Sequence, residues 1–439
     1  MSDHRIQRAA FGLRRARRNP VLTACCCLAV LLAAPPGSAQ SGSNPVVDWA
    51  TIVQPAIHNA AAPRPVPLAE ILHTTIQLAV YDAVMAIKGG YEPYATDIAA
   101  PGGADVRAAV ATAAYRTARA RVAPSQHAYL DAQYALYLAG ILDGQGKSDG
   151  IQVGEEAAAG ILARRANDGF TNVVPYQCSA TPPPVGEFEP NGGCGTQPVG
   201  ANVPQITPFT YSNPARFAPD GPPPLASDEY AADFVETRDY GRTNSAFRTP
   251  DQTDIVYFWS EHSYVHWNRN LNSLALSRQL NARDSARFLA MVHTAASDAV
   301  IAGFEAKYFH RFWRPRTAIP RAADDGNPAT DADPSWIPEL TVNHPEYPSA
   351  HAFWSTAVTD TVAEFFGTDK VTWTLETPQS AVPQVVQTTR TYQNVKQIMR
   401  EIDNARVWAG LHWRSSMRDG GKIGRQVSKH VTRNFFRPK

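Results

Sequence analysis

The sequence predicts an all-α protein made of helical bundles that are joined by long proline-rich loops. Alanine-rich stretches with apolar residues at helical spacing recur along the chain, whereas the alternation typical of strands is scarce. Thirteen of the 35 prolines fall within residues 171–226, which separates the helical stretches into two groups. With 439 residues, 44% of them hydrophobic, the chain is long enough for a large core or for two fused cores.

Residues 1–39 are predicted to be a signal peptide. Six arginines and one acidic residue within residues 1–18 precede an apolar run at residues 20–34, which is too short to span a bilayer easily. The small residues Gly37 and Ala39 then suit cleavage. We therefore expect a secreted or periplasmic protein. An uncleaved anchor and a lipoprotein attached through Cys25 remain as alternatives.

The charge balance argues against a general nucleic-acid binder. The formal net charge is +1, but residues 1–18 contribute +5 to it, so the rest of the chain carries −4. After the signal segment there is no second long apolar stretch, which predicts a mature chain without a membrane span. The sequence leaves a homo-oligomer open.

The predicted N-terminal half, residues 40–226, contains helices at residues 73–87, 106–122 and 151–167. It ends in a proline-rich arm at residues 171–226, which we expect to wrap the surface or to roof a pocket. Cys178 and Cys194 lie in this arm. In an exported protein they predict a disulfide, and two free thiols are the alternative.

The predicted C-terminal half, residues 227–439, is a helical bundle with helices at residues 283–309, 351–366, 389–409 and 422–436. A loop at residues 321–347 interrupts it. Three short segments of this half gather the chemistry: residues 307–315 (KYFHRFWRP), 348–351 (PSAH) and 406–412 (RVWAGLH). Their lysine, arginines, serine and histidines suit a tetrahedral oxyanion such as phosphate or vanadate.

Each segment alone also fits an ordinary structural role: a basic helix end, a capped helix or a core histidine. Lys307 and Arg314 are seven residues apart, which places them on one face of a helix that Pro315 would end. Ser349 is the predicted N-cap of the next helix, with the backbone N–H of Ala350 free to bind an anion.

In the third segment, Gly410 is predicted to break a helix and to turn His412 inward. The flanking Trp408 and Trp413 are expected to wall a dry pocket around Arg406 and His412.

Together the patterns Lys-x6-Arg-Pro, Pro-Ser-x-His and Arg-x5-His resemble the superfamily of type 2 phosphatidic acid phosphatases and vanadium-dependent haloperoxidases. Residues 244–253 (NSAFRTPDQT) and 344–352 (HPEYPSAHA) are similar to its bacterial, soluble haloperoxidase branch. The resemblance implies an all-helical bundle with vanadate as cofactor and phosphate as a competing anion. It also implies hydrogen peroxide, a halide and a small organic acceptor as partners.

The resemblance also implies residue roles. His351 would be the acid/base, and His412 the apical ligand to vanadium or the nucleophile toward a phosphoryl group. His344 favours bromide or iodide over chloride. Lys307 would also polarise the bound peroxide. The anion's oxygens would be held by Lys307, Arg314, Ser349, Arg406 and the backbone N–H of Ala350.

Two residues depart from the family pattern. Ala350 stands where glycine is usual, and Ser416 stands where many members have an aspartate that supports the apical histidine. With Asp419 nearby, we expect weaker anion affinity rather than loss of the fold. Three functions follow: an exported vanadate-dependent haloperoxidase, an exported phosphatase with a phosphohistidine intermediate, and a degenerate anion-binding protein.

Overall fold

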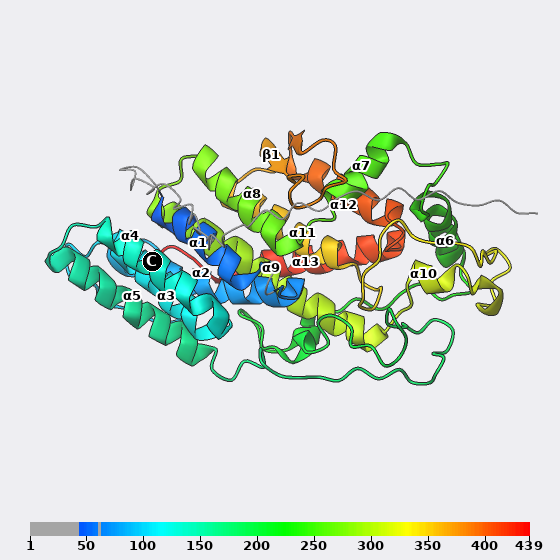
Figure 1. The fold of residues 1–439 in the computed structure, drawn as a ribbon, viewed down its shortest axis with the longest axis horizontal. Helices are drawn as coiled ribbons and strands as arrows, with labels where there is room; N and C mark the ends of the chain where they lie inside the picture. Colours follow the sequence, from blue (N-terminus) through cyan, green and yellow to red (C-terminus); the bar gives the residue numbers. More distant parts are fainter. Residues whose placement is uncertain (1–43, 60–62) are drawn as a thin grey trace, which may run out of the picture. The chain divides into compact units, whose positions relative to one another are not determined.

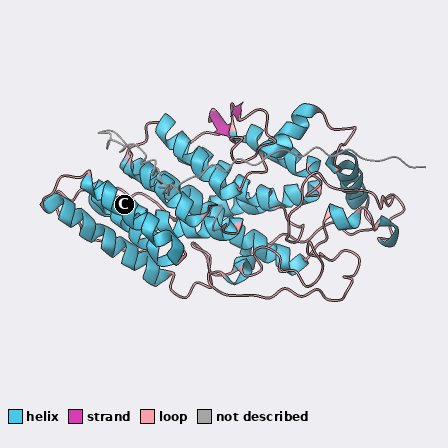
Figure 2. Ribbon diagram, in the orientation of Figure 1, coloured by secondary structure: helices cyan, strands magenta, loops and turns pink. Residues whose placement is uncertain are grey.

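Helices form nearly all of the regular structure in the computed structural model, which describes residues 44–59 and 63–439 (Figures 1 and 2). The described residues belong to one compact unit, and the predicted signal peptide lies outside them. The α-helices are α1 (Pro45–Ile57), α2 (Val66–Lys88), α3 (Val106–Arg121), α4 (His127–Ala139), α5 (Gln145–Arg164), α6 (Asp228–Gly241), α7 (Pro250–Phe258), α8 (Ser263–Ser277), α9 (Ala282–His310), α10 (Pro315–Ala318), α11 (Ala350–Phe366), α12 (Val395–Trp408) and α13 (Arg414–Asn434).

The predicted all-α class is confirmed, with one small exception. Strands β1 (Trp373–Glu376) and β2 (Thr389–Tyr392) form an antiparallel pair, with Trp373 opposite Tyr392. The helix predicted at residues 389–409 is therefore wrong at its start. Residues 389–392 alternate between exposed and buried, as β-branched and aromatic residues favour, and α12 begins only at Val395, capped by the Asn394 side chain.

The long helices α2 and α9 pack against each other at the centre of the fold (Figure 1). Helices α3 and α5 pack beside α2, whereas α11 and α13 pack beside α9. One apolar cluster consequently runs from Val46 to Phe436 and includes residues from both predicted halves. The boundary at residue 226 stays a prediction.

Glycines let the helices that carry the candidate site approach closely. A Cβ atom on Gly303 of α9 would lie 2.1 Å from the Phe353 ring of α11. A Cβ on Gly424 of α13 would lie 2.5 Å from the Phe353 carbonyl oxygen. The absence of side chains at these two positions lets α11 approach both α9 and α13 closely.

Helix α9 matches the helix predicted at residues 283–309 but does not continue to Arg314, as the Lys307–Arg314 spacing predicted. Arg311 adopts a left-handed conformation with φ 48°, so the helix stops at His310. Arg314 lies beyond it in extended backbone, and Pro315 begins α10 instead of ending α9. Lys307 and Arg314 therefore do not share a helix face, which corrects that prediction. The last helix also begins earlier than expected, at Arg414.

The arm at residues 171–226 contains no α-helix, only two short 3₁₀ turns, Val203–Gln205 and Pro214–Phe217. Its predicted disulfide between Cys178 and Cys194 is present. The buried carboxylate of Asp298 in α9 accepts the N–H groups of Phe209 and Thr210 at 2.6 and 3.0 Å, which ties the arm to the core. Among the described residues, no helix has the length and apolarity needed to cross a membrane.

Candidate active site

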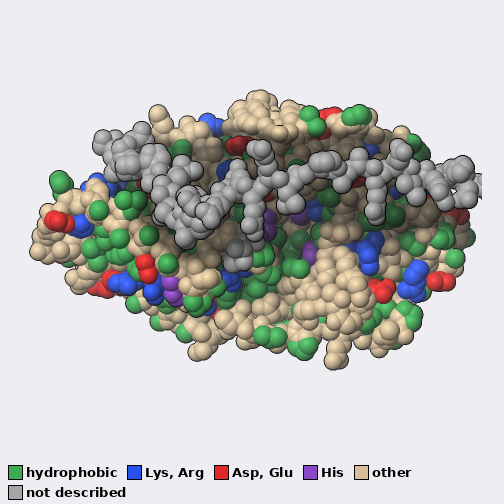
Figure 3. Space-filling view, in the orientation of Figure 1, with side chains coloured by type: hydrophobic (Ala, Val, Ile, Leu, Met, Phe, Trp, Pro, Cys, Tyr) green, Lys and Arg blue, Asp and Glu red, His purple; other side chains and the backbone are tan. Residues whose placement is uncertain are grey.

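The second and third basic segments meet at a pocket of about 410 Å³. Histidine side chains are visible near the middle of the face shown in Figure 3. Much of the pocket surface is apolar, and its rim includes residues of α2 and of the proline-rich arm. The pocket is lined by Val66, Pro67, Val199, Ser260, Glu261, His262, Ser263, Phe304, Val342, Asn343, His344, Ala350, His351, Trp354, Arg406 and His412.

The break between α12 and α13 turns His412 toward the pocket, as predicted. Gly410 has φ 70°, and a Cβ there would lie 2.4 Å from the Gly241 carbonyl oxygen, so a larger residue does not fit. The expected tryptophan walls are wrong. Trp413 is buried in a separate apolar cluster, and Trp408 does not line the pocket.

A buried glutamate that the sequence argument did not single out supports His412. Glu346 is fully buried, and its Oε1 lies 2.7 Å from His412 Nδ1. The same oxygen accepts the Trp413 backbone N–H at 3.1 Å. The carboxylate therefore favours the tautomer with the proton on Nδ1, which leaves a lone pair on Nε2. An imidazole nitrogen in this state can coordinate a metal centre or attack phosphorus.

Glu346 supplies the carboxylate that seemed to be missing at Ser416. It comes from the loop before α11 and not from α13, so only the fold brings it to His412. Asp419 does not take this role, because it accepts the Tyr347 hydroxyl at 2.9 Å and pairs with Arg418 and Lys422. The acidic residue within HPEYPSAHA was the available sequence signal.

Lys307 and Arg314 hold the loop that carries Glu346. Lys307 Nζ donates to the carbonyl oxygens of Pro345 and Glu346, both at 2.9 Å. Arg314 donates to the carbonyl oxygens of His344 and Leu411, both at 2.7 Å. The two cations are buried behind the pocket surface and do not line it. Burial lowers the pKa of Lys307 well below its ordinary value, and the neighbouring Arg314 lowers it further.

Ser349 is the N-cap of α11, as predicted, but its hydroxyl does not cap the helix. Its Oγ is buried and has no hydrogen-bond partner among the described residues. The first N–H groups of α11 have no partner within the helix, and the helix dipole favours negative charge there. Ala350, at the first position of α11, lines the pocket. This end of α11 therefore has unused donors for an anion.

Arg406 also has unused donor capacity. One terminal nitrogen donates to the Trp259 carbonyl oxygen at 3.0 Å, whereas the buried Nε has no partner among the described residues. Burial and the charge of Arg314 lower the pKa of Arg406 to about 9.

Positive charge exceeds negative charge in this region. Lys307, Arg314 and Arg406 are at most 3% exposed, and none forms an ion pair among the described residues. The Glu346 carboxylate raises the pKa of two of them, Lys307 and Arg314. Burial raises its pKa to about 7, against the lowering effects of Arg314 and Lys307. Buried cations without counter-charges are costly. The unused donors of Ser349 and Arg406 therefore fit a compact oxyanion such as vanadate or phosphate.

His351 and His344 both line the pocket. Burial lowers the pKa of His351 well below its ordinary value, and the charges of Arg406 and His266 lower it further, so the ring is neutral and able to accept a proton. Its Nε2 is 3.4 Å from Ser263 Oγ. The His344 ring lies 5.5 Å from that of Phe304, and Arg314 donates toward His344 Nδ1 at 3.0 Å.

Comparisons with known proteins agree with this site. Residues 287–438 match the family model of the VCPO second helical-bundle domain. Vanadium chloroperoxidase from Curvularia inaequalis is 25% identical over 229 residues, which cover 39% of this chain and 37% of that protein. The chain thus matches well under half the length of this curated relative.

Two solved structures share the fold. A bacterial vanadium-dependent iodoperoxidase is 20% identical, with a TM-score of 0.73 over 90% of this chain and 96% of that one. A bacterial vanadium-dependent chloroperoxidase is 17% identical, with a TM-score of 0.68 over 87% and 94%. The matched domain at residues 287–438, the shared fold and the converging segments together support membership of the superfamily of vanadium-dependent haloperoxidases and type 2 phosphatidic acid phosphatases.

Proposed function

We propose that this protein is a vanadate-dependent haloperoxidase that oxidises a halide with hydrogen peroxide. The cluster of buried basic side chains carries the proposal, because burial lowers the pKa of Lys307, Arg314 and Arg406 and a multiply charged anion beside them would stabilise their charged forms. The unpartnered Ser349 Oγ and Arg406 Nε supply donors for its oxygens.

In this proposal His412 Nε2 binds the metal atom of vanadate while Glu346 holds Nδ1–H. The oxygens are held by Lys307, Arg314, Ser349, Arg406 and the backbone N–H of Ala350. When bound, vanadate supplies Lewis-acid activation of hydrogen peroxide toward attack by halide.

His351 lines the same pocket as His412. Its neutral ring takes the proton that hydrogen peroxide loses on binding, and it returns a proton when the halide is oxidised. Lys307 has two of its three N–H donors engaged by the loop, so one remains to polarise a bound oxygen.

We propose bromide or iodide as the halide rather than chloride. His344 lies at the pocket wall beside Phe304, and its side chain is a polar imidazole rather than an apolar aromatic ring. The similar iodoperoxidase structure supports this assignment. The apolar part of the pocket, with Trp354 and Phe304, suits a small organic acceptor.

A phosphatase that uses His412 as nucleophile is the competing function, since the same donors accept phosphate. The largely apolar pocket favours the haloperoxidase, because a charged phosphate ester gains little from it. We also propose export to the periplasm or the exterior, which the Cys178–Cys194 disulfide supports.

A paired assay tests the proposal. The protein is loaded with vanadate and followed for peroxide-dependent bromination and iodination of a dye, while anion-free protein is offered an aryl phosphate. We expect halide oxidation that depends on vanadate and little phosphate release. Phosphate turnover without halide oxidation establishes the phosphatase instead. Tight anion binding without either activity identifies an anion-binding protein.

A further inference from the structure

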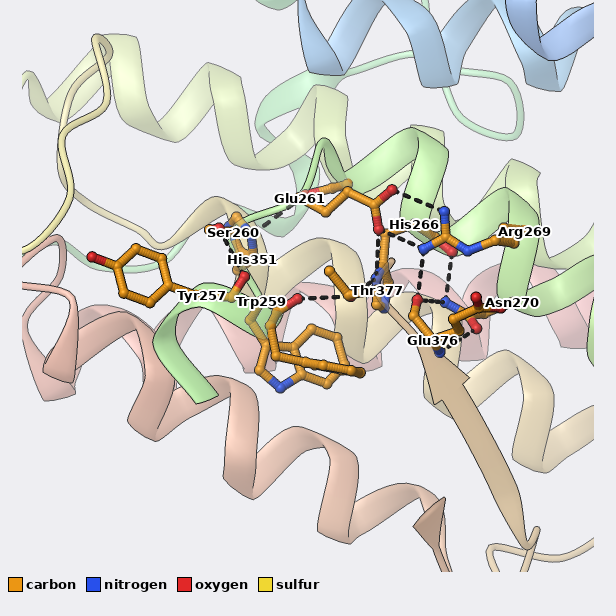
Figure 4. Close-up of polar contacts among 12 residues, drawn as sticks. Tyr257, Trp259, Ser260, Glu261, His266, Arg269, Asn270, His351, Glu376 and Thr377 are labelled. Atoms are coloured by element: carbon orange, nitrogen blue, oxygen red, sulfur yellow. Dashed lines mark hydrogen bonds and ion pairs between the residues drawn. The ribbon is translucent and has the colours of Figure 1, made fainter. Parts of the chain in front are cut away.

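A second buried histidine shares a small cavity with His351 but does not line the large pocket. His266 of α8 is 3% exposed, and its Nδ1 lies 3.1 Å from Thr377 Oγ1 and 3.3 Å from Glu261 Oε2 (Figure 4). The Thr377 hydroxyl donates its only proton to the Phe258 carbonyl oxygen at 2.9 Å. Thr377 Oγ1 must therefore accept from His266, which places the proton of the neutral ring on Nδ1.

The other ring nitrogen of His266 is consequently a free acceptor. Nε2 is buried and has no hydrogen-bond partner among the described residues. A buried acceptor without a partner costs free energy unless a water molecule satisfies it. The structure provides a place for that water.

A small cavity separates His266 from His351. It is lined by both histidines together with Trp259, Glu261, Ser263 and Trp267, and it offers about 10 Å³ to the centre of a water molecule. That is room for one water. The water would find polar partners in the two rings and in the Ser263 hydroxyl, which lies 3.4 Å from His351 Nε2.

The carboxylate of Glu261, which contacts His266 Nδ1, is charged. Arg269 donates to Glu261 Oε1 at 2.9 Å and to Oε2 at 2.5 Å. Burial raises the pKa of Glu261, but Arg269 and His266 together hold it below its ordinary value, so the carboxylate is ionised. Glu261 also lines the large pocket. A path of titratable groups therefore leaves the pocket at His351 and returns to it at Glu261.

We infer that His266, Glu261 and one water in the small cavity form a reversible proton relay that removes a proton from His351 and returns it in each reaction cycle, an inference that rests on the proposed function. The His351 N–H bond breaks as its proton passes to the water oxygen. A proton of the same water passes to His266 Nε2, so the water is unchanged. The Nδ1 proton of His266 then moves to Glu261. When the halide is oxidised, the same transfers in reverse return a proton to His351 and restore the proton on His266 Nδ1.

Kinetics of the full chain test the relay. His266→Gln keeps a polar group near the position of Nε2 but does not carry a proton through the ring. We expect kcat for halide oxidation to fall about 100-fold, at the low end of acid–base effects. KM and vanadate affinity should not change, because His266 does not line the large pocket.

The control is His73→Gln, because His73 is also fully buried but contacts Tyr264 and Gln77 rather than the cavity. In mixtures of H₂O and D₂O, a relay predicts a curved dependence of kcat on deuterium content for wild type and His73→Gln. The dependence should become linear in His266→Gln. An unchanged kcat and an unchanged curve in a folded His266→Gln overturn the inference.

A crystal structure of the anion-free protein tests the relay without any activity. It should show one ordered water within about 3.2 Å of His266 Nε2 and of a His351 ring nitrogen. A dry cavity overturns the relay. If wild type does not oxidise halides at all, the proposed function is refuted, and the presence or absence of this water decides whether the hydrogen-bonded path exists.

Discussion

The two histidines of the pocket, His412 and His351, are supported in different ways. His412 is 1% exposed and has a direct carboxylate partner, Glu346, at 2.7 Å. His351 is partly exposed, and its nearest side-chain partner is a serine hydroxyl at 3.4 Å. A direct carboxylate fixes one tautomer, which suits a ligand. A loosely held ring is free to exchange protons, which suits an acid/base. The difference in support thus predicts a difference in role.

The largest expected effect comes from removing each ring in turn. His412→Ala should lose both vanadate binding and halide oxidation, because it removes the ligand. His351→Ala should still bind vanadate, whereas its turnover should fall at least about 100-fold. Equilibrium binding of vanadate and the dye assay measure the two quantities. Loss of vanadate binding in His351→Ala equal to that in His412→Ala would show that the roles are not separate.

A smaller effect is expected from Glu346→Gln. The amide oxygen can still accept from Nδ1–H and from the Trp413 N–H, but it is uncharged and therefore makes His412 Nε2 a weaker ligand. We expect vanadate affinity to fall roughly 10-fold to 100-fold. Phosphate affinity should not fall, because phosphate is held without that coordination. Calorimetric titrations with vanadate and with phosphate measure the ratio of the two affinities.

The matched control is Glu70→Gln, which removes the carboxylate of another buried pair, Glu70 with His293 at 2.8 Å, outside the pocket. Glu70→Gln should lower the melting temperature without changing the ratio of vanadate to phosphate affinity. An equal change of that ratio in both variants would mean that Glu346 acts only through stability.

The smallest expected effect is a pH dependence of stability. Burial, Arg406 and His266 lower the pKa of His351 in the folded protein below its unfolded value of about 6.5. Between these two pKa values the unfolded chain binds more protons, so wild type loses stability as pH falls below about 6.5. Compared with His351→Gln, wild type should lose up to about 1.4 kcal/mol of unfolding free energy per pH unit. Urea unfolding of both proteins at pH 7, 6 and 5 measures this loss. The same pH dependence of the unfolding free energy in both proteins would contradict the lowered pKa.

Local sequence patterns were enough to find most of the candidate site. The Pro-Ser-x-His pattern correctly gave the N-cap at Ser349, and Gly410 correctly gave the turn at His412, because both depend on neighbouring residues. Glu346 was missed because it reaches His412 across 66 residues of sequence. His266 and Glu261 were missed for the same reason, since their relation to His351 requires distant segments to meet around the small cavity.

Two other differences have local causes that the sequence did not reveal. Arg311 enters the left-handed region, where arginine is uncommon, so the helix periodicity that joined Lys307 to Arg314 was misleading. The residues of β2 favour a strand and pair with β1, and the prediction was wrong because it extended the helical pattern of α12 back over them.

The proline-rich arm has a consequence for how this protein can diversify. Val199 of the arm lines the pocket, and its N–H donates to the Asn343 carbonyl oxygen at 2.7 Å, one residue before His344. Val66 and Pro67 of α2 line the same rim. The entrance is therefore built by segments that carry none of the anion donors. Exchanging residues of the arm between homologues should alter the choice of organic acceptor and leave the chemistry intact, which makes this arm the natural segment for engineering selectivity.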